Sequence, residues 1–418
     1  MQPARPLEGL RIVELSSYVA GPLGGMTLAQ LGADVIRVEP LGGAPDRTRQ
    51  PLADSGTSLY WSGLNKGKRA VEVDLGTEEG RELVADLITA GGPGGGIVLA
   101  NSERHQDLSY EALSARRPDV IHVLLTGRRD GSAAVDYTVQ AATGFPQLTG
   151  PEGTAGPVNH LMPAWDVAAG LYLAVGLLAA ERHRLRTGEG QQVRVALEDV
   201  ALATAGNLGY LAEAQLSPEP RTRAGNYVYG TFGRDFTTSD GGHLMVVALT
   251  ARHWQDLLAA TGLTGAVEAV GRALGADLSD DEFARYTHRK VLGELLAGWF
   301  AAHTLAGAQQ ALGRTRVLWS TYRSFADLAS DDAQLLRENP LMARIGQAGI
   351  PPHWAPGSPV VMGRTQSPPE PSPTIGEHTD DVLRTELGCS GVELEKLGEA
   401  GVIRPRRSTH PHTTTTGS

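Results

Sequence analysis

Short apolar runs alternate with amphipathic segments along the first half of the chain. Six runs have the length and β-branched content of buried strands: 11–15 (RIVEL), 34–39 (DVIRVE), 70–75, 97–101, 120–126 and 192–197. Five segments have apolar positions at helical spacing: 21–31, 78–89, 110–116, 166–186 and 199–213. Strands that alternate with helices pair in parallel through right-handed crossovers. The pattern therefore predicts a doubly wound, Rossmann-like α/β domain.

The pattern changes after Gln215. Ser217-Pro218-Glu219-Pro220 predicts a linker. The pattern of residues 231–250 predicts a β-hairpin that turns at 239–242 (SDGG). Helical spacing dominates from 252 to 312, which predicts a smaller, separate α+β domain. A proline-rich stretch, 351–373, then leads to a last helical segment at 380–397.

Composition narrows the class of protein. A chain of 418 residues is long for one hydrophobic core, so two domains are expected. The net charge of −10 argues against nucleic-acid binding, although a local cluster of Arg and Lys could still hold an anionic cofactor. The single cysteine, Cys389, excludes an intrachain disulfide and fits a reducing cytoplasm. The longest apolar run, Val167–Ala180, is shorter than the roughly 20 residues of a membrane span, so we expect no membrane partner.

Several common sites have no support in the sequence. The glycine-rich segment 91–96 lacks the Gly-Lys-Ser/Thr of a phosphate-binding loop. The glycines at 21, 24 and 25 do not form a Gly-x-Gly-x-x-Gly fingerprint for NAD. The histidines lack metal-binding spacing, and no Gly-x-Ser-x-Gly elbow is present. We therefore expect no metal and no serine nucleophile.

Two polar features remain. Asp166, in PAWDVAAG, precedes a long apolar helix. Two compatible interpretations follow: the residue is a helix N-cap, or it is a carboxylate nucleophile kept ionised by the helix terminus. Arg37 ends the second strand, and Lys66, Lys68 and Arg69 precede the third. These cations form either an ordinary solvated surface or a phosphate-binding group at the ligand-binding edge of the sheet.

Four long segments together resemble the family III CoA-transferases. They are LEGLRIVELSSYVAGPLGGMTLAQLGADVIRVEP, NKGKRAVEVDL, PAWDVAAGLYLAVGLLAAERHRLRTGEGQQVRVALEDVAL and PTIGEHTDDVLRTELGCS. The resemblance implies that Asp166 is the nucleophile and that Arg37, Lys68 and Asn101 contact CoA, which enters as part of the substrate. It also implies that Arg223-Ala224-Gly225-Asn226 begins the small domain, where relatives carry a mobile loop over the active site.

The resemblance implies an unusual architecture. In the family, the two ends of the chain build the large domain, and two ring-shaped chains interlock into a homodimer. We accordingly expect large-domain segments at 1–215 and 340–403, a small domain at 221–335, and a disordered tail at 404–418.

A closer resemblance indicates the substrate. The segments AVDYTVQAATGFPQLTGP, PVNHLMPAWD and GNYVYGTFGRDFTTSDG are similar to family members that move CoA between the C1 and C4 carboxyl groups of one mesaconate molecule. By this resemblance we expect an aspartyl-CoA thioester on Asp166. Tyr137, Gln140 and Asn226 are our candidates for holding the substrate carboxylates.

Two departures from relatives and three alternatives accompany this interpretation. Val19 replaces the glutamine of formyl-CoA transferases, and Val135 replaces the histidine of the family's racemases, which disfavours both chemistries. An intermolecular transferase between an acyl-CoA donor and a small acid stays open, as do a disfavoured α-methylacyl-CoA racemase-like isomerase and a non-catalytic CoA-binding protein. If the covalent mechanism holds, its oxyanions require backbone amides, which we expect near the start of the Asp166 helix or in the Gly225 loop.

Overall fold

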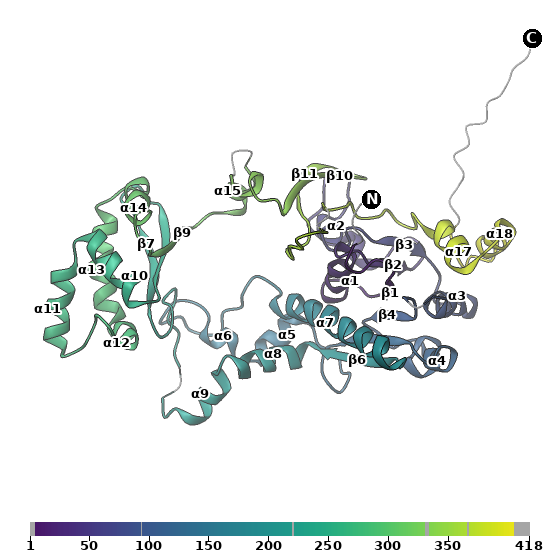
Figure 1. Ribbon diagram of the computed structural model, residues 1–418, viewed down its shortest axis with the longest axis horizontal. Helices are drawn as coiled ribbons and strands as arrows, with labels where there is room; N and C mark the ends of the chain where they lie inside the picture. Colours follow the sequence, from purple (N-terminus) through teal and green to yellow (C-terminus); the bar gives the residue numbers. More distant parts are fainter. Residues whose placement is uncertain (1–4, 93, 220, 331–333, 366–367, 405–418) are drawn as a thin grey trace, which may run out of the picture. The chain divides into compact units, whose positions relative to one another are not determined.

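The structure is a computed structural model that describes residues 5–92, 94–219, 221–330, 334–365 and 368–404 (Figure 1). The described residues form two compact units. Unit 1 comprises residues up to 143, residues 161–209 and those from 334 onward, whereas unit 2 comprises 144–160 and 210–333. Unit 1 is thus built from both ends of the chain. Residues 144–160 and 210–215, which we expected in the large domain, belong to unit 2, and residues 334–335, which we expected in the small domain, belong to unit 1. The tail from 405 onward lies outside the described residues.

A parallel sheet of six strands forms the centre of unit 1. Its strands are β1 (Arg11–Leu15), β2 (Asp34–Glu39), β3 (Arg69–Glu72), β4 (Ile97–Ala100), β5 (Ile121–Thr126) and β6 (Gln191–Ala196). Their spatial order is β3-β2-β1-β4-β5-β6, and every neighbouring pair is parallel. The predicted α/β class is confirmed, and each strand lies within one or a few residues of its predicted position.

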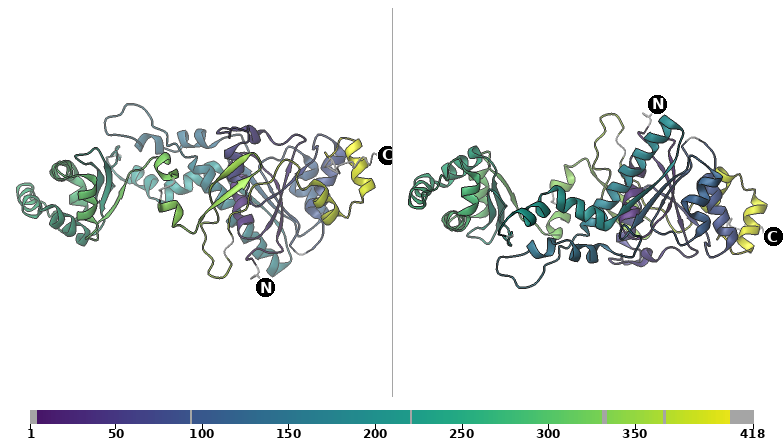
Figure 2. Two further views of the ribbon diagram at one scale, coloured as in Figure 1. Left: turned by 90° about the horizontal axis from the view of Figure 1, so that it is seen from above. Right: turned by 90° about the horizontal axis from the view of Figure 1, so that it is seen from below.

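Helices pack on both faces of this sheet (Figure 2). One face carries α1 (Ala20–Gln30) and α7 (Ala164–Thr187), and the other carries α3 (Glu78–Thr89), α4 (Tyr110–Arg116), α17 (Thr379–Leu387) and α18 (Gly391–Glu399). The C-terminal segment reaches the β3 edge, where the His378 amide donates to Ala70 O at 2.9 Å. This contact places the C-terminal part of the chain in the same domain as its N-terminal part.

A close approach of two helices sets the position of α7. A Cβ on Gly24 of α1 would lie 2.9 Å from the carbonyl oxygen of Gly170, and one on Gly170 would lie 2.8 Å from that of Ala20. Real side chains do not tolerate such contacts, so only glycines allow the two backbones to touch here. The first turn of α7 is thereby fixed beside the start of α1.

Helix α7 is the one described helix that is long and apolar enough, by composition, to cross a membrane. Its 24 residues extend beyond the apolar run that we judged too short. One face of this helix, including Leu173 and Leu177, is buried and packs against α1 and the sheet.

The remaining elements of unit 1 lie around this frame. They are η1 (Pro45–Thr48), α2 (Leu59–Leu64), η2 (Gln106–Leu108), α5 (Asp136–Ala142), α8 (Leu197–Asn207), α16 (Gln334–Arg337), β10 (Met342–Gln347) and β11 (Ile350–Pro356). Strands β10 and β11 form an antiparallel hairpin, which we did not predict because β11 contains three prolines. A two-stranded sheet has outer edges where proline costs no ladder hydrogen bond, so the hairpin accommodates them.

Unit 2 has its own sheet and core. Strands β7 (Phe232–Thr237), β8 (His243–Ala248) and β9 (Leu318–Thr321) are antiparallel in that order. The helices of this unit are α6 (Phe145–Leu148), α9 (Tyr210–Leu216), α10 (Ala251–Thr261), α11 (Thr264–Leu274), α12 (Glu282–Thr287), α13 (Arg289–Ala301), α14 (Leu305–Leu312) and α15 (Phe325–Ala329). The predicted hairpin and the helical region are confirmed. The single helix predicted at 199–213 is wrong: α8 and α9 are separate, because the chain turns at Gly209 with a positive φ of 82°.

Candidate active site

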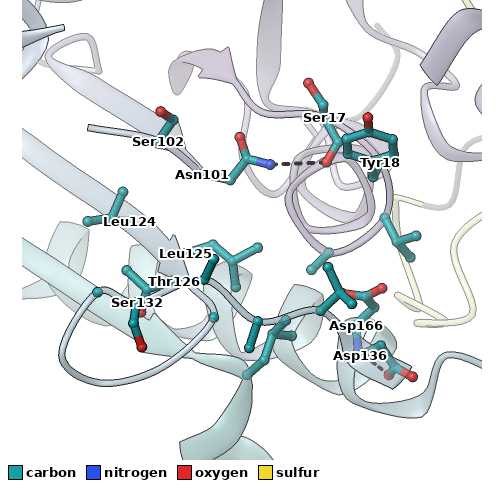
Figure 3. Close-up of a pocket in the computed structure, with 18 of the residues that line it drawn as sticks. Ser17, Tyr18, Asn101, Ser102, Leu124, Leu125, Thr126, Ser132, Asp136 and Asp166 are labelled. Atoms are coloured by element: carbon teal, nitrogen blue, oxygen red, sulfur yellow. Dashed lines mark hydrogen bonds between the residues drawn. The ribbon is translucent and has the colours of Figure 1, made fainter. Parts of the chain in front are cut away.

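A cavity of about 660 Å³ opens at the carboxyl edge of the unit 1 sheet. Its walls come from the ends of β5 and β6, from the residues that follow β1, β4, β5 and β6, and from the starts of α5 and α7 (Figure 3). Strand order reverses between β1 and β4, and open α/β sheets bind their ligands at this kind of switch point. Asp166 lies in this cavity.

Asp166 is the third residue of α7, and the N-cap position is Pro163, which makes no side-chain cap. The N-cap reading of Asp166 is therefore wrong. The Asp166 carboxylate takes part in no hydrogen bond or ion pair among the described residues. Its oxygens are consequently available to a substrate.

The start of α7 is capped by another carboxylate, Asp136. Its Oδ2 accepts the backbone N–H of Trp165 at 2.7 Å and that of Asp166 at 3.2 Å (Figure 3). Asp136 is 1% exposed, and its other oxygen, Oδ1, is buried with no hydrogen-bond partner in the described structure. Two amides that we expected to stabilise an oxyanion are thus already bonded to Asp136. The pair is distant in sequence, so only the fold brings these residues together.

The surroundings of Asp166 disfavour its charge. Burial, the largest cause, and the Asp136 charge together raise the pKa of Asp166 to about 6, although the charge of Arg49 offsets part of the rise. We expected the helix terminus to keep this carboxylate ionised, but Asp136 takes up amides of that terminus. Asp166 is still ionised mainly above pH 6, and it is then poorly solvated. A poorly solvated carboxylate is a stronger nucleophile than one in water.

Arg37 and Lys68 lie in a buried ion-pair network and do not line the cavity. Arg37, with 0% exposed, contacts Glu14 at 3.1 Å and Asp46 at 3.0 Å, while Lys68 contacts Glu14 at 2.8 Å. Burial lowers the pKa of Lys68 to about 8. The structure gives neither cation a surface on which a phosphate could bind, and the CoA contact that the resemblance implies for them stays a prediction.

This network nevertheless supports the cavity wall. The Asp46 Oδ2 that Arg37 binds also accepts the backbone N–H of Tyr18 at 2.8 Å. Tyr18 has a positive φ of 73°, which costs a bulky residue conformational free energy. The buried pair Arg37–Asp46 therefore holds Tyr18 in a strained conformation at the edge of the cavity.

The other predicted residues have different positions. Asn101 lines the cavity, and its Nδ2 donates to Ser17 O at 3.2 Å (Figure 3). Tyr137 also lines it, whereas Gln140, one turn further along α5, is fully buried and does not. Asn226 belongs to unit 2, where it lines a separate pocket with Gly225 and Tyr227. The roles of these residues in substrate binding stay predictions.

Three other features of the cavity complete its chemistry. Val19 and Val135, the two departures from relatives with other activities, both line it. Arg49 lines it as well, although nothing in the local sequence around this residue marks it as functional. Among the described residues, no group of three or more His, Cys, Asp or Glu side chains is arranged to hold a metal ion.

Residues 7–379 match the family model of CoA-transferase family III, and the chain therefore belongs to this family of enzymes. The resemblance found in the sequence is confirmed. At 47% identity, the chain is similar to the 2-methylfumaryl-CoA isomerase of Chloroflexus aurantiacus, over 95% of this chain and 97% of that protein. It is 30% identical to the succinyl-CoA:mesaconate CoA-transferase of Haloarcula marismortui, over 93% and 99% of the two chains. The crystal structure of a CAIB/BAIF family protein from Brucella suis matches with a TM-score of 0.72 and 27% identity, over 91% and 99% of the two chains.

Proposed function

We propose that this enzyme moves CoA between the C1 and C4 carboxyl groups of mesaconate, with Asp166 as the covalent carrier. The observation that carries the proposal is the Asp166 carboxylate, which is partly buried, unpaired among the described residues and open to a cavity at the ligand-binding edge of the sheet. The name of the Chloroflexus relative, 2-methylfumaryl-CoA isomerase, supports the choice of substrate.

The chemistry consists of four exchanges between acyl groups. The Asp166 carboxylate attacks the thioester carbonyl, the C–S bond breaks, and a mixed anhydride and CoA thiolate result. The thiolate attacks the Asp166 carbonyl carbon of the anhydride, which gives an aspartyl-CoA thioester and free mesaconate. Mesaconate turns and attacks that thioester with its other carboxylate, which releases the thiolate. The thiolate then attacks the mesaconyl carbonyl, and Asp166 leaves as a carboxylate.

None of these steps transfers a proton. Each nucleophile is an anion, and each leaving group departs as an anion, so the sequence needs no general base. The described residues that line the cavity include no histidine and no cysteine, which accords with this scheme. A racemase requires a base at the α-carbon, and Val135 at the corresponding position supplies none.

An isotope experiment tests the proposed reaction. The enzyme is given unlabelled mesaconyl-CoA together with ¹³C-labelled free mesaconate, and the isomeric thioester product is analysed by mass spectrometry. We expect product without label, since the same acid molecule keeps its CoA. Label in the product would establish an intermolecular transferase instead, the activity named for the Haloarcula relative.

A substitution tests the covalent carrier. Asp166→Ala should abolish turnover while binding of the CoA ester is retained, and hydroxylamine should trap an adduct only in the wild type. Asp130→Ala, which removes an exposed carboxylate from the loop between β5 and α5, is the matched control and should keep full activity. Turnover by Asp166→Ala would refute the mechanism.

We further propose that the enzyme is a homodimer of interlocked chains, the assembly that its resemblance to the family implies. An exposed apolar face on α7, formed by Leu171, Tyr172 and Val175, supports a partner at this helix. Val175 and Val392 of α18 are both 62% exposed, so they make a matched pair. Val175→Glu should yield monomers or misfolded protein in light scattering, and Val392→Glu should leave the dimer intact. A monomeric wild type, or an intact Val175→Glu dimer, would contradict the proposal.

We place the enzyme in the cytoplasm, where acyl-CoA esters are made and used. The free thiol of Cys389 is partly buried and has no disulfide partner, as expected of a reducing compartment. Fractionation of cells with an antibody to the chain tests this placement, and recovery outside the cytoplasm would contradict it.

A further inference from the structure

Arg49 is a cation in the cavity with no carboxylate partner. It follows η1 and lines the same cavity as Asp166. None of the ion pairs among the described residues involves Arg49. Arg194, the other arginine of the cavity, is bound to Glu103 at 3.3 Å. Arg49 is therefore the cavity arginine whose charge is left for a ligand.

The Arg49 guanidinium is held in place by aromatic rings. Its central carbon lies 5.6 Å from the ring centre of Tyr18 and 4.7 Å from that of Tyr60. Such cation–π contacts orient a guanidinium but leave its N–H groups unused. The backbone of Arg49 is fixed as well, since its carbonyl accepts a hydrogen bond from Ser58 Oγ at 2.5 Å. The arginine is thus positioned before any ligand arrives.

The chemistry of the cavity indicates which ligand this arginine fits. Asp136 and Asp166 make the inner wall acidic, so a dianionic acid entering beside them needs a cation. A planar guanidinium binds a carboxylate through two parallel N–H···O bonds, a geometry that lysine cannot provide. A dicarboxylic acyl-CoA has one carboxyl group in the thioester and one free carboxylate that must be bound.

We propose that Arg49 binds the carboxylate of the substrate acid that is bonded neither to CoA nor to Asp166, and that it thereby selects acyl groups with a second carboxylate. This inference rests on the proposed transfer within a dicarboxylic acid. One arginine serves both halves of the reaction. When the acid turns, Arg49 releases the carboxylate that then acts as the nucleophile, and it binds the other carboxylate of the acid instead. Arg49 thus binds one carboxylate before the acid turns and the other after it, which keeps the acid in the cavity between the two halves of the reaction.

A rival role for Arg49 makes a different prediction. If the arginine served only as a counterion for Asp166, its removal would slow the reaction of every acyl-CoA by the same factor. If it binds the second carboxylate, its removal slows only dicarboxylic acyl-CoA esters. Paired substrates that differ in the second carboxylate separate the two roles.

The experiment compares succinyl-CoA with butyryl-CoA, which has a methyl group in place of the free carboxylate. The second-order rate of aspartyl-CoA formation on Asp166 is followed by intact-protein mass spectrometry. Wild type should strongly prefer succinyl-CoA. Arg49→Met should lose about 10- to 100-fold with succinyl-CoA, the range expected for hydrogen bonds to a charged group, and at most about 3-fold with butyryl-CoA. Arg49→Lys should recover part of the loss.

Controls and contrary outcomes complete the test. Arg194→Met, which removes the paired arginine of the same cavity, should leave the preference for succinyl-CoA unchanged. The butyryl-CoA rate serves as an internal measure of folding for each variant. Equal losses with both esters in Arg49→Met, or an undiminished preference, would overturn the role of Arg49. Wild type that discriminates succinyl-CoA from butyryl-CoA but does not turn over mesaconyl-CoA would refute the proposed function alone.

Discussion

Asp136→Asn should shift the pH dependence of the enzyme to lower pH. Asp136 binds two amides at the start of α7 through Oδ2, and an asparagine amide oxygen can accept the same two hydrogen bonds. The substituted NH₂ group takes the place of Oδ1, which has no hydrogen-bond partner in the described structure, so no existing bond is lost. The change therefore removes a negative charge beside Asp166 and keeps the tether.

The size of the shift follows from the causes of the Asp166 pKa. Burial is the larger cause that raises this pKa from 3.8 to about 6, and the Asp136 charge is the second. Asp136 thus supplies less than half of the upward effect, and we expect the pKa of Asp166 to fall by about one pH unit, on the order of 1.4 kcal/mol. At pH 5, the ionised fraction of Asp166 would rise about fivefold.

The assay is the pH profile of kcat/KM for mesaconyl-CoA between pH 4.5 and 8, because its acid limb reports the nucleophile of the free enzyme. The acid limb of Asp136→Asn should move down by about one unit, with a lower plateau since the less basic carboxylate is a weaker nucleophile. Asp130→Asn, on the exposed loop before α5, should leave the profile in place. An acid limb that stays fixed or moves to higher pH would refute the electrostatic coupling.

Two stability predictions follow from the same site. Asp166→Asn should stabilise the fold at pH 8 but not at pH 4. The pKa of Asp166 in the folded protein, about 6, lies above that of an unfolded aspartate, so ionisation of this residue opposes folding. The cost is at most about 3 kcal/mol above pH 6 and disappears below about pH 4. Urea unfolding at the two pH values measures this, and equal stability of both proteins at pH 8 would contradict it. Arg37→Met should destabilise unit 1 by about 3–5 kcal/mol, because it leaves Asp46 buried without its cation, whereas Glu14 keeps Lys68. Thermal or urea unfolding checks this, and a loss below about 1 kcal/mol would contradict the structural role of the network.

Local sequence determined the elements that carry their own signals. Helices α3 and α4 have their predicted bounds because Thr77 and Ser109 cap them and an apolar stripe follows each cap. The strands of the parallel sheet are short apolar runs rich in β-branched residues, a composition that favours a strand at that length. The β7–β8 hairpin was found from its turn residues. Resemblance, and not periodicity, identified Asp166 as the nucleophile.

Tertiary structure decided the environment of that nucleophile. Asp136 caps α7 from a different helix, and Arg49 approaches the cavity from the segment after η1, so neither pairing leaves a trace in local sequence. The pattern gives the type of an element, because propensity and periodicity act over a few residues. Burial, charge pairing and pKa depend on which distant segments come into contact. Here the close crossing of α1 and α7 at Gly24 and Gly170 fixes the position of the first turn of α7, which carries Asp166. The sequence by itself thus determined the strands of the sheet and most of its helices, whereas only the fold decided that Asp166 is partly buried and shares its cavity with one other acid and one unpaired arginine.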